Sequence, residues 1–141
     1  MKILKSSFLA FFMISAASLT FISCGDDDTC AQADWTGTYT GDATVSEDGV
    51  DEMADSASVT ITASGTDDIA VSYSYTIDNQ ENSITFDPFA ASGCTITQSA
   101  SDPNAGVSID MTLSLDGNDL TLESEMTGGG FNSTVTITAS K

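Results

Sequence analysis

Residues 107–126 read VSIDMTLSLDGNDLTLESEM. Every second residue is apolar from Val107 to Leu115, and the alternation resumes at Leu120 after the polar stretch Asp116-Gly117-Asn118-Asp119. Successive side chains of a β-strand point to opposite faces, so this pattern buries one face and leaves the other in water. Asp-Gly between two such runs is a strong signal for a hairpin turn. The stretch therefore predicts two antiparallel strands joined by a tight turn.

Alternating runs of the same kind cover most of the chain after residue 34. Further alternations are found over residues 35–43, 57–63, 69–77, 84–86, 94–98 and 131–139. Turn residues lie at 64–65, 78–82, 87–88 and 128–130, and the polar stretches 46–55 and 101–106 are predicted to be loops, the first of them mobile. No run after residue 30 has a helical period. We therefore predict about eight antiparallel strands and an all-β domain.

The predicted strands must bury one face each and protect the edges of their sheet. A meander of strands linked by hairpins does both when it closes into an up-and-down barrel. Short connections between consecutive strands favour this barrel, and a two-sheet β-sandwich is the alternative.

The charge balance excludes several classes of partner. The chain has 141 residues, of which 21 are acidic and 3 basic, for a formal net charge of −18. The basic residues are Lys2, Lys5 and Lys141, and there is no Arg or His. Such a surface repels phosphate backbones, so we predict no nucleic-acid binding. It also offers no polybasic patch for an anionic membrane.

The N-terminal segment has the features of an export signal. Lys2 and Lys5 precede an uncharged apolar stretch over residues 8–22, which the small residue Ser23 and then Cys24 follow. Phe21-Ile22-Ser23-Cys24 resembles the lipobox of bacterial lipoproteins. The resemblance implies that residues 1–23 are a signal peptide and that Cys24 becomes the lipidated N-terminus, which anchors the protein to a membrane. The alternative is a plain cleaved signal peptide.

The acidic stretch Gly25-Asp26-Asp27-Asp28 follows Cys24 directly. It resembles the tether that directs lipoproteins of the Bacteroidota type to the outer face of the outer membrane. The resemblance implies a tether over residues 24–33, a β-domain over residues 34–141 and exposure at the cell surface. The alternatives are an ordinary solvated linker and an anchor on the periplasmic face.

An exported protein with three cysteines needs an explanation for the odd number. If Cys24 carries lipid, Cys30 and Cys94 remain, and an oxidising compartment makes a disulfide between them plausible. Two free thiols are the alternative. A zinc site is disfavoured, because the chain has no His and two thiols with carboxylates make a poor structural set.

Aromatic residues of the predicted strands are candidates for a ligand cavity. Residues 35–41, Trp-Thr-Gly-Thr-Tyr-Thr-Gly, resemble the opening strand of lipocalin-like domains in small bacterial lipoproteins, and residues 134–141 resemble their closing strand. The resemblance implies a small lipocalin-like barrel. Trp35, Tyr39, Tyr73 and Tyr75, with Phe86, are the predicted lining for an apolar or sugar ligand. The alternative is that these side chains fill a solid core.

The sequence contains few of the residue types that catalysis and metal binding require. Without His or Arg, no Ser-His-Asp or Cys-His arrangement can form, so we predict that the protein is not an enzyme. A hydrolase that uses two carboxylates is the remaining catalytic alternative. Oxygen ligands for calcium cluster at Asp102/Asn104/Asp110 and at Asp116/Asn118/Asp119, but neither set matches a twelve-residue calcium loop. We predict no metal and no cofactor.

The sequence thus predicts an outer-membrane-anchored lipoprotein with a non-catalytic barrel that binds a small apolar or sugar ligand or a protein partner. The alternative is a structural or coat lipoprotein with a packed core and no ligand. The sequence predicts no particular oligomeric state.

Overall fold

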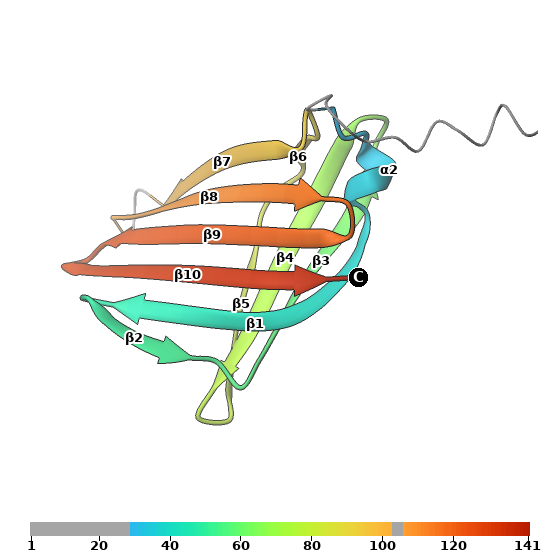
Figure 1. The fold of residues 1–141 in the computed structure, drawn as a ribbon. Coiled ribbons are helices and arrows are strands. Elements are labelled where there is room, and N and C mark those ends of the chain that lie inside the picture. Colours follow the sequence, from blue (N-terminus) through green and yellow to red (C-terminus); the bar gives the residue numbers. More distant parts are fainter. Residues whose placement is uncertain (1–28, 103–105) are drawn as a thin grey trace, which may run out of the picture.

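The computed structural model describes residues 29–102 and 106–141 (Figure 1). Its elements are α2 (Gln32–Trp35), β1 (Gly37–Glu47), β2 (Val50–Met53), β3 (Ser56–Ser64), β4 (Asp68–Ile77), β5 (Gln80–Thr85), β6 (Phe89–Ala90), β7 (Thr95–Asp102), β8 (Val107–Asp116), β9 (Asp119–Gly128) and β10 (Phe131–Ser140). All strands belong to one antiparallel sheet. The prediction of an all-β fold is confirmed. No helix in these residues is both long and apolar enough to cross a membrane.

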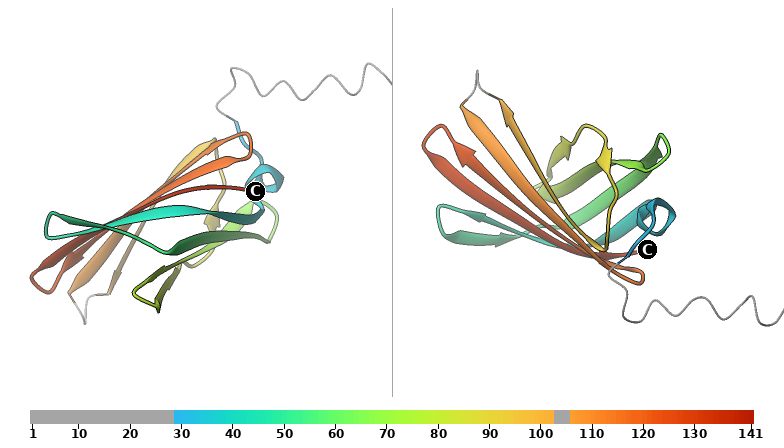
Figure 2. Two further views of the ribbon diagram at one scale, coloured as in Figure 1. Left: turned by 60° about the horizontal axis from the view of Figure 1, so that its bottom comes forward. Right: turned by 90° about the horizontal axis from the view of Figure 1, so that it is seen from above.

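The strand order is that of an up-and-down barrel with one open seam. The order is β5-β4-β3-β1-β10-β9-β8-β7, while β2 pairs with β1 and β6 with β4. The first long strand thus pairs with the last one, from Thr40↔Ser140 to Glu47↔Ser133. Within residues 29–102 and 106–141, no ladder joins β5 to β7. The sheet therefore forms a half-barrel whose walls, β7–β10 and β3–β5, face each other (Figure 2).

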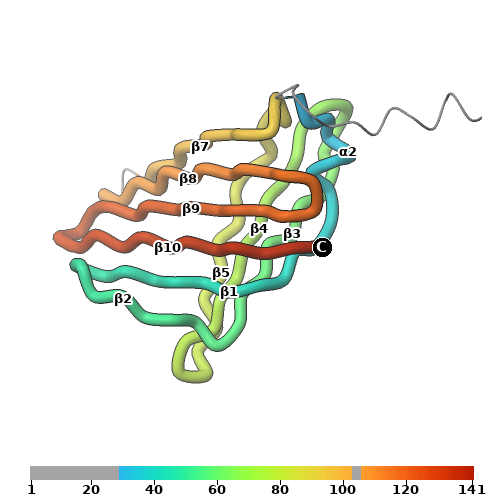
Figure 3. Tube along the Cα trace, in the orientation of Figure 1, coloured from blue at the N-terminus to red at the C-terminus, as the bar shows by residue number. Residues whose placement is uncertain are grey.

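The half-barrel has two different ends, which Figure 3 traces. We call the end with α2 and the C-terminal Lys141 the closed end. The strands turn back at the other end, which we call the open end, at Asp48-Gly49, Asp78-Asn79 and Gly129-Gly130.

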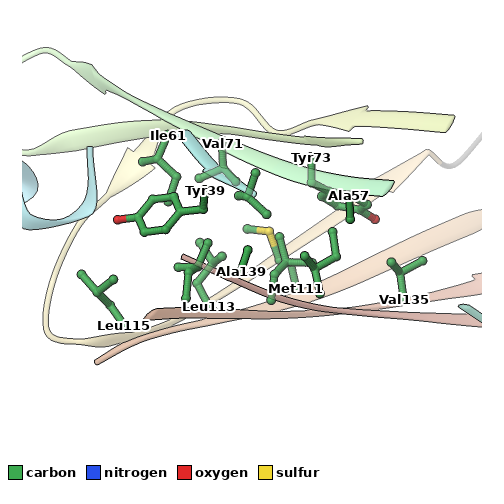
Figure 4. Packing of buried hydrophobic residues seen from close by; sticks show 14 of the residues in the cluster. Tyr39, Ala57, Ile61, Val71, Tyr73, Met111, Leu113, Leu115, Val135 and Ala139 are labelled. Carbon is green, nitrogen blue, oxygen red and sulfur yellow. The ribbon is translucent and has the colours of Figure 1, made fainter. Parts of the chain in front are cut away.

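The core lies between the two walls and is built from the alternating positions. The buried residues are Trp35, Tyr39, Ala43, Val45, Ala57, Val59, Ile61, Ile69, Val71, Tyr73, Phe86, Ile96, Met111, Leu113, Leu115, Leu120, Leu122, Val135, Ile137 and Ala139. Figure 4 shows residues of β3 and β4 opposite residues of β8 and β10 across this core. Burial of these apolar faces is the main stabilising term of the fold.

The closed end is held together by specific polar contacts. Trp35 is fully buried, and its Nε1 donates a hydrogen bond to the Gly93 carbonyl oxygen at 3.2 Å. The Tyr39 hydroxyl donates to the Trp35 carbonyl at 2.8 Å. Lys141 Nζ donates to the Asp34 carbonyl at 2.7 Å and lies 5.1 Å from the centre of the Tyr39 ring, a favourable cation–π distance. These contacts fasten both chain ends of the domain to the same place.

A disulfide between Cys30 and Cys94 completes the closed end, with a Cα–Cα distance of 4.8 Å. The predicted pairing is confirmed. The bridge spans a sequence separation of 64 residues. In the chain-entropy model, a loop of that size stabilises the folded state by about 4 kcal/mol.

Three local predictions differ from the structure. The stretch 46–55, predicted as a mobile loop, contains the end of β1, a tight turn and β2, which pairs with β1 from Thr44↔Met53 to Glu47↔Val50. Its turn is Asp48-Gly49, where both φ angles are positive (49° and 84°), as a type I′ hairpin turn requires. The predicted turn 78–82 is only Asp78-Asn79, also with positive φ, and β5 begins at Gln80.

The third difference concerns Trp35, which was predicted to open the first strand. It ends the one-turn helix α2, and β1 begins at Gly37. The Asp34 carboxylate accepts a hydrogen bond from the Ala31 backbone N–H at 2.8 Å and caps this turn. Four residues are too few for a helical period to be visible in the sequence.

Candidate functional site

The core does not fill the half-barrel at its open end. Along β4, Tyr73 is 2% exposed, whereas Tyr75, two residues closer to the open end, is half-buried. A hollow of about 270 Å³ lies here between the walls, which we call the mouth pocket. It is lined by Glu47, Tyr73, Tyr75, Asn82, Ser83, Ile84, Ser124, Met126, Phe131, Ser133 and Val135.

The floor of the mouth pocket is a buried polar pair. The Tyr73 hydroxyl donates a hydrogen bond of 2.9 Å to Ser124 Oγ. Ser124 is 1% exposed and occupies an inward position of β9. Burial raises the pKa of Tyr73 to about 12, against a smaller lowering by the Ser124 hydrogen bond. Tyr73 is therefore a neutral phenol at neutral pH.

The rim of the pocket combines aromatic and acidic groups. Phe131, at the start of β10, is 42% exposed. Burial, and then the negative charge of Glu47, raise the pKa of Tyr75. Glu47 and Tyr75 both line the pocket, so a carboxylate and a phenol share its rim.

An acidic cleft of about 570 Å³ adjoins the mouth pocket. We define it by its carboxylates Glu47, Asp48, Glu52 and Asp78 and its other lining residues Val45, Val50, Tyr75, Ile77, Gln80 and Asn82. Glu47, Tyr75 and Asn82 line both hollows, so the two are adjacent. The register of the β1–β2 hairpin explains the composition, because Glu52 pairs with Val45 and Val50 with Glu47, and paired residues share a face.

The structure divides the four predicted ligand residues between the two ends. Tyr73 and Tyr75 line the mouth pocket. Trp35 and Tyr39 are fully buried at the closed end, where their polar atoms bond to backbone carbonyls. Phe86 is buried beside Tyr73, with ring centroids 6.5 Å apart. The two groups do not form one cavity lining, and a role in ligand binding stays a prediction for Tyr73 and Tyr75.

The other predicted sites have simpler surroundings. Asp116, Asn118 and Asp119 belong to the exposed β8–β9 turn. In the other candidate calcium cluster, Asp102/Asn104/Asp110, Asn104 lies outside the described residues, as Cys24 does. Among the residues that the structure describes, no three His, Cys, Asp or Glu side chains are grouped so that they could hold a metal ion.

Sequence reasoning did not select most of the pocket. Ser124, Met126, Phe131 and Ser133 fall on the inward positions of their predicted strands. Ser124 carried a usable signal, since it is a polar residue at an inward position between Leu122 and Met126. Glu47 was missed because it lies in the stretch that was predicted as a loop.

Comparisons with known proteins concern the fold. No protein-family model matches the sequence. No curated protein is significantly similar to it. A solved structure described as a redesigned beta barrel is similar, with a TM-score of 0.54 and 16% identity, over 79% of this chain and 94% of that chain. The likeness supports the barrel architecture, and at this identity it carries no information about function.

Proposed function

We propose that this protein is a lipid-anchored surface lipoprotein whose half-barrel binds a small ligand in the mouth pocket and catalyses no reaction. The class of the domain, a β-barrel, is the part that the fold establishes. The ligand, the anchor and the location are the proposal.

The incomplete filling of the core supports ligand binding. The closed end is sealed by Trp35, Tyr39 and the disulfide, whereas the open end keeps a hollow next to the buried pair of Tyr73 and Ser124. Small-molecule sites typically combine apolar and aromatic walls with a few placed polar groups. The mouth pocket has this composition, with Met126, Phe131 and Val135 beside Tyr73 and Ser124.

The N-terminal sequence supports the anchor. Phe21-Ile22-Ser23-Cys24 has the order of a lipobox, and the acidic residues after it fit a tether. The disulfide places Cys30 at the closed end. An anchor upstream of Cys30 would therefore attach at the end opposite the mouth pocket, and the pocket would face away from the membrane.

Two other functions compete with this proposal. A structural or coat protein with no ligand is favoured by the dense packing of the closed end. A carboxylate hydrolase would act in the acidic cleft, but such an enzyme needs a carboxyl group that its surroundings keep protonated. The four carboxylates of the cleft are all exposed to water, which favours binding over catalysis.

Ligand binding can be tested by methyl NMR on the full chain with benzyl alcohol as a neutral probe. The chain has five methionines. Met126 lines the pocket, Met111 is buried in the core and Met53 is 65% exposed on β2, so the methyl signals of these three report on different places. We expect benzyl alcohol to shift the Met126 signal far more than the Met53 signal. Ser133→Phe should abolish the shift, because Ser133 lines the pocket and a phenyl ring there would fill it.

Thr134→Phe is the matched control. Its side chain points to the opposite face of the same strand, so the shift should persist. If neither benzyl alcohol nor its charged analogues shift Met126, or if both variants respond as the unmodified protein does, the pocket is not a ligand site.

A further inference from the structure

We infer that the mouth pocket prefers an organic cation, an ammonium or quaternary ammonium group on an apolar body, over neutral or anionic ligands of the same shape. The inference rests on the proposed function and names the class of ligand for that site. Three features carry it: the carboxylate shared by the two hollows, the aromatic rings beside it, and the distribution of charge over the molecule.

The two hollows together suit an amphiphile, because one has apolar walls and the other has charged walls. The mouth pocket supplies apolar walls from Ile84, Met126 and Val135. The adjoining acidic cleft supplies carboxylates, and Glu47 lines both. A ligand with its apolar body between the walls would therefore place its polar group beside Glu47.

The aromatic rings at the rim favour a positive polar group. Tyr75 lines both hollows, and Phe131 lines the pocket with a partly exposed ring. The face of an aromatic ring attracts cations through its quadrupole, and a nearby carboxylate adds to the attraction. An ammonium group at this rim would contact both kinds of group at once.

No cation of the described chain competes for this place. Lys141 is the only Lys or Arg in residues 29–102 and 106–141, and it is bound to the Asp34 carbonyl and the Tyr39 ring at the closed end. The net charge of −18 also raises the local concentration of cations and repels anions. An anionic ligand would find no positive partner in either hollow.

The experiment compares benzyltrimethylammonium, benzyl alcohol and benzenesulfonate by titration of the Met126 methyl signal. We expect the cation to bind most tightly and the sulfonate to bind least. Glu47→Gln should weaken the binding of the cation about threefold, as loss of one exposed charge contact predicts, and should weaken the binding of benzyl alcohol by less. Salt should weaken only the cation, through screening.

Glu123→Gln is the control for net charge, because it removes the same charge from an exposed position of β9 outside both hollows. It should leave the affinity for the cation nearly unchanged. If the cation binds no better than benzyl alcohol, or if the two Gln variants weaken it equally, the inference fails while the pocket stands. If neither compound shifts Met126, the proposed function fails with it.

Discussion

At the scale of single residues, the buried phenol of Tyr73 connects the core to the proposed site. Its ring packs beside Phe86, and its hydroxyl meets Ser124 on the opposite wall. A buried hydroxyl without a partner would be costly, so this pair satisfies a group that the fold places in an apolar environment. The hydrogen bond also ties β4 to β9 across the floor of the pocket.

The raised pKa of Tyr73 makes stability depend on alkaline pH. A tyrosine in the unfolded chain has a pKa of about 10, whereas burial raises that of Tyr73 to about 12 in the folded protein. The folded state thus favours the neutral phenol. This contribution is fully present below pH 10 and is lost as the pH rises through 12. We expect Tyr73→Phe to reduce the loss of unfolding free energy between pH 9 and pH 11.5 by about 2 kcal/mol, measured by urea denaturation.

Tyr75→Phe serves as the comparison for this measurement. Tyr75 is only half-buried, so its replacement should change the alkaline loss by less. Equal alkaline losses in the unmodified protein and in Tyr73→Phe would show that Tyr73 ionises alike in the folded and unfolded states.

At the scale of elements, the contact between β1 and β10 depends on a glycine. Gly41 pairs with Ala139 on β10 and with Ala57 on β3, so it lies where the two walls of the half-barrel join. A Cβ atom at Gly41 would lie 2.1 Å from the Thr138 carbonyl oxygen and 2.6 Å from Ala139 Cα. These are backbone atoms, which cannot move aside as a flexible side chain could.

Gly41→Ala should therefore force β1 away from β10. We expect a loss of about 3 kcal/mol in unfolding free energy, at the upper end of the usual cost of overpacking. Thr40→Ala changes the neighbouring exposed residue and should cost less than about 1 kcal/mol. Thermal and urea unfolding of the two variants give the measurement. Equal stability would mean that the strands approach each other less closely than the structure indicates.

The elements also show how far the sequence can be interpreted. Alternation identified the buried positions of β3, β4, β8, β9 and β10. Every second side chain of a strand lies on the same face, so a strand with one buried face has an apolar residue at every second position. The β1–β2 hairpin was missed because β2, Val-Asp-Glu-Met, is exposed throughout. A strand without a buried face does not need apolar residues at alternate positions, so it lacks the sequence pattern of a strand. Its Asp48-Gly49 turn was a better signal than its acidic composition.

The mouth pocket could be predicted only in part. Tyr73 and Tyr75, two of the predicted ligand residues, line the mouth pocket, but Trp35 and Tyr39 are buried at the other end of the half-barrel. Which residues of the two walls face each other depends on long-range contacts, as between Tyr73 on β4 and Ser124 on β9. The open seam between β5 and β7 likewise could not be predicted, because local sequence patterns do not show which strands pair across the sheet.

At the scale of the whole molecule, the two ends of the half-barrel differ: one is fastened by covalent and polar contacts, and the other contains the hollows. The disulfide, α2 and Lys141 gather at one end, and the mouth pocket and acidic cleft lie at the other. An anchored domain of this shape would meet solutes with its open end. The acidic surface would keep it apart from an anionic membrane. Both consequences depend on whether Cys24 carries lipid.

Lipidation of Cys24 can be tested by expressing the full chain in a bacterial host that is fed an alkyne-tagged fatty acid. The unmodified protein should carry the tag and partition with membranes, because acyl chains anchor it. Cys24→Ala should carry none, since the remaining cysteines, Cys30 and Cys94, are joined to each other. Ser23→Ala keeps a small residue before the cysteine and should be tagged normally. A tag that persists in Cys24→Ala would contradict the anchor, and the binding of benzyl alcohol at Met126 should be the same in all three proteins, because the pocket lies at the opposite end from Cys30.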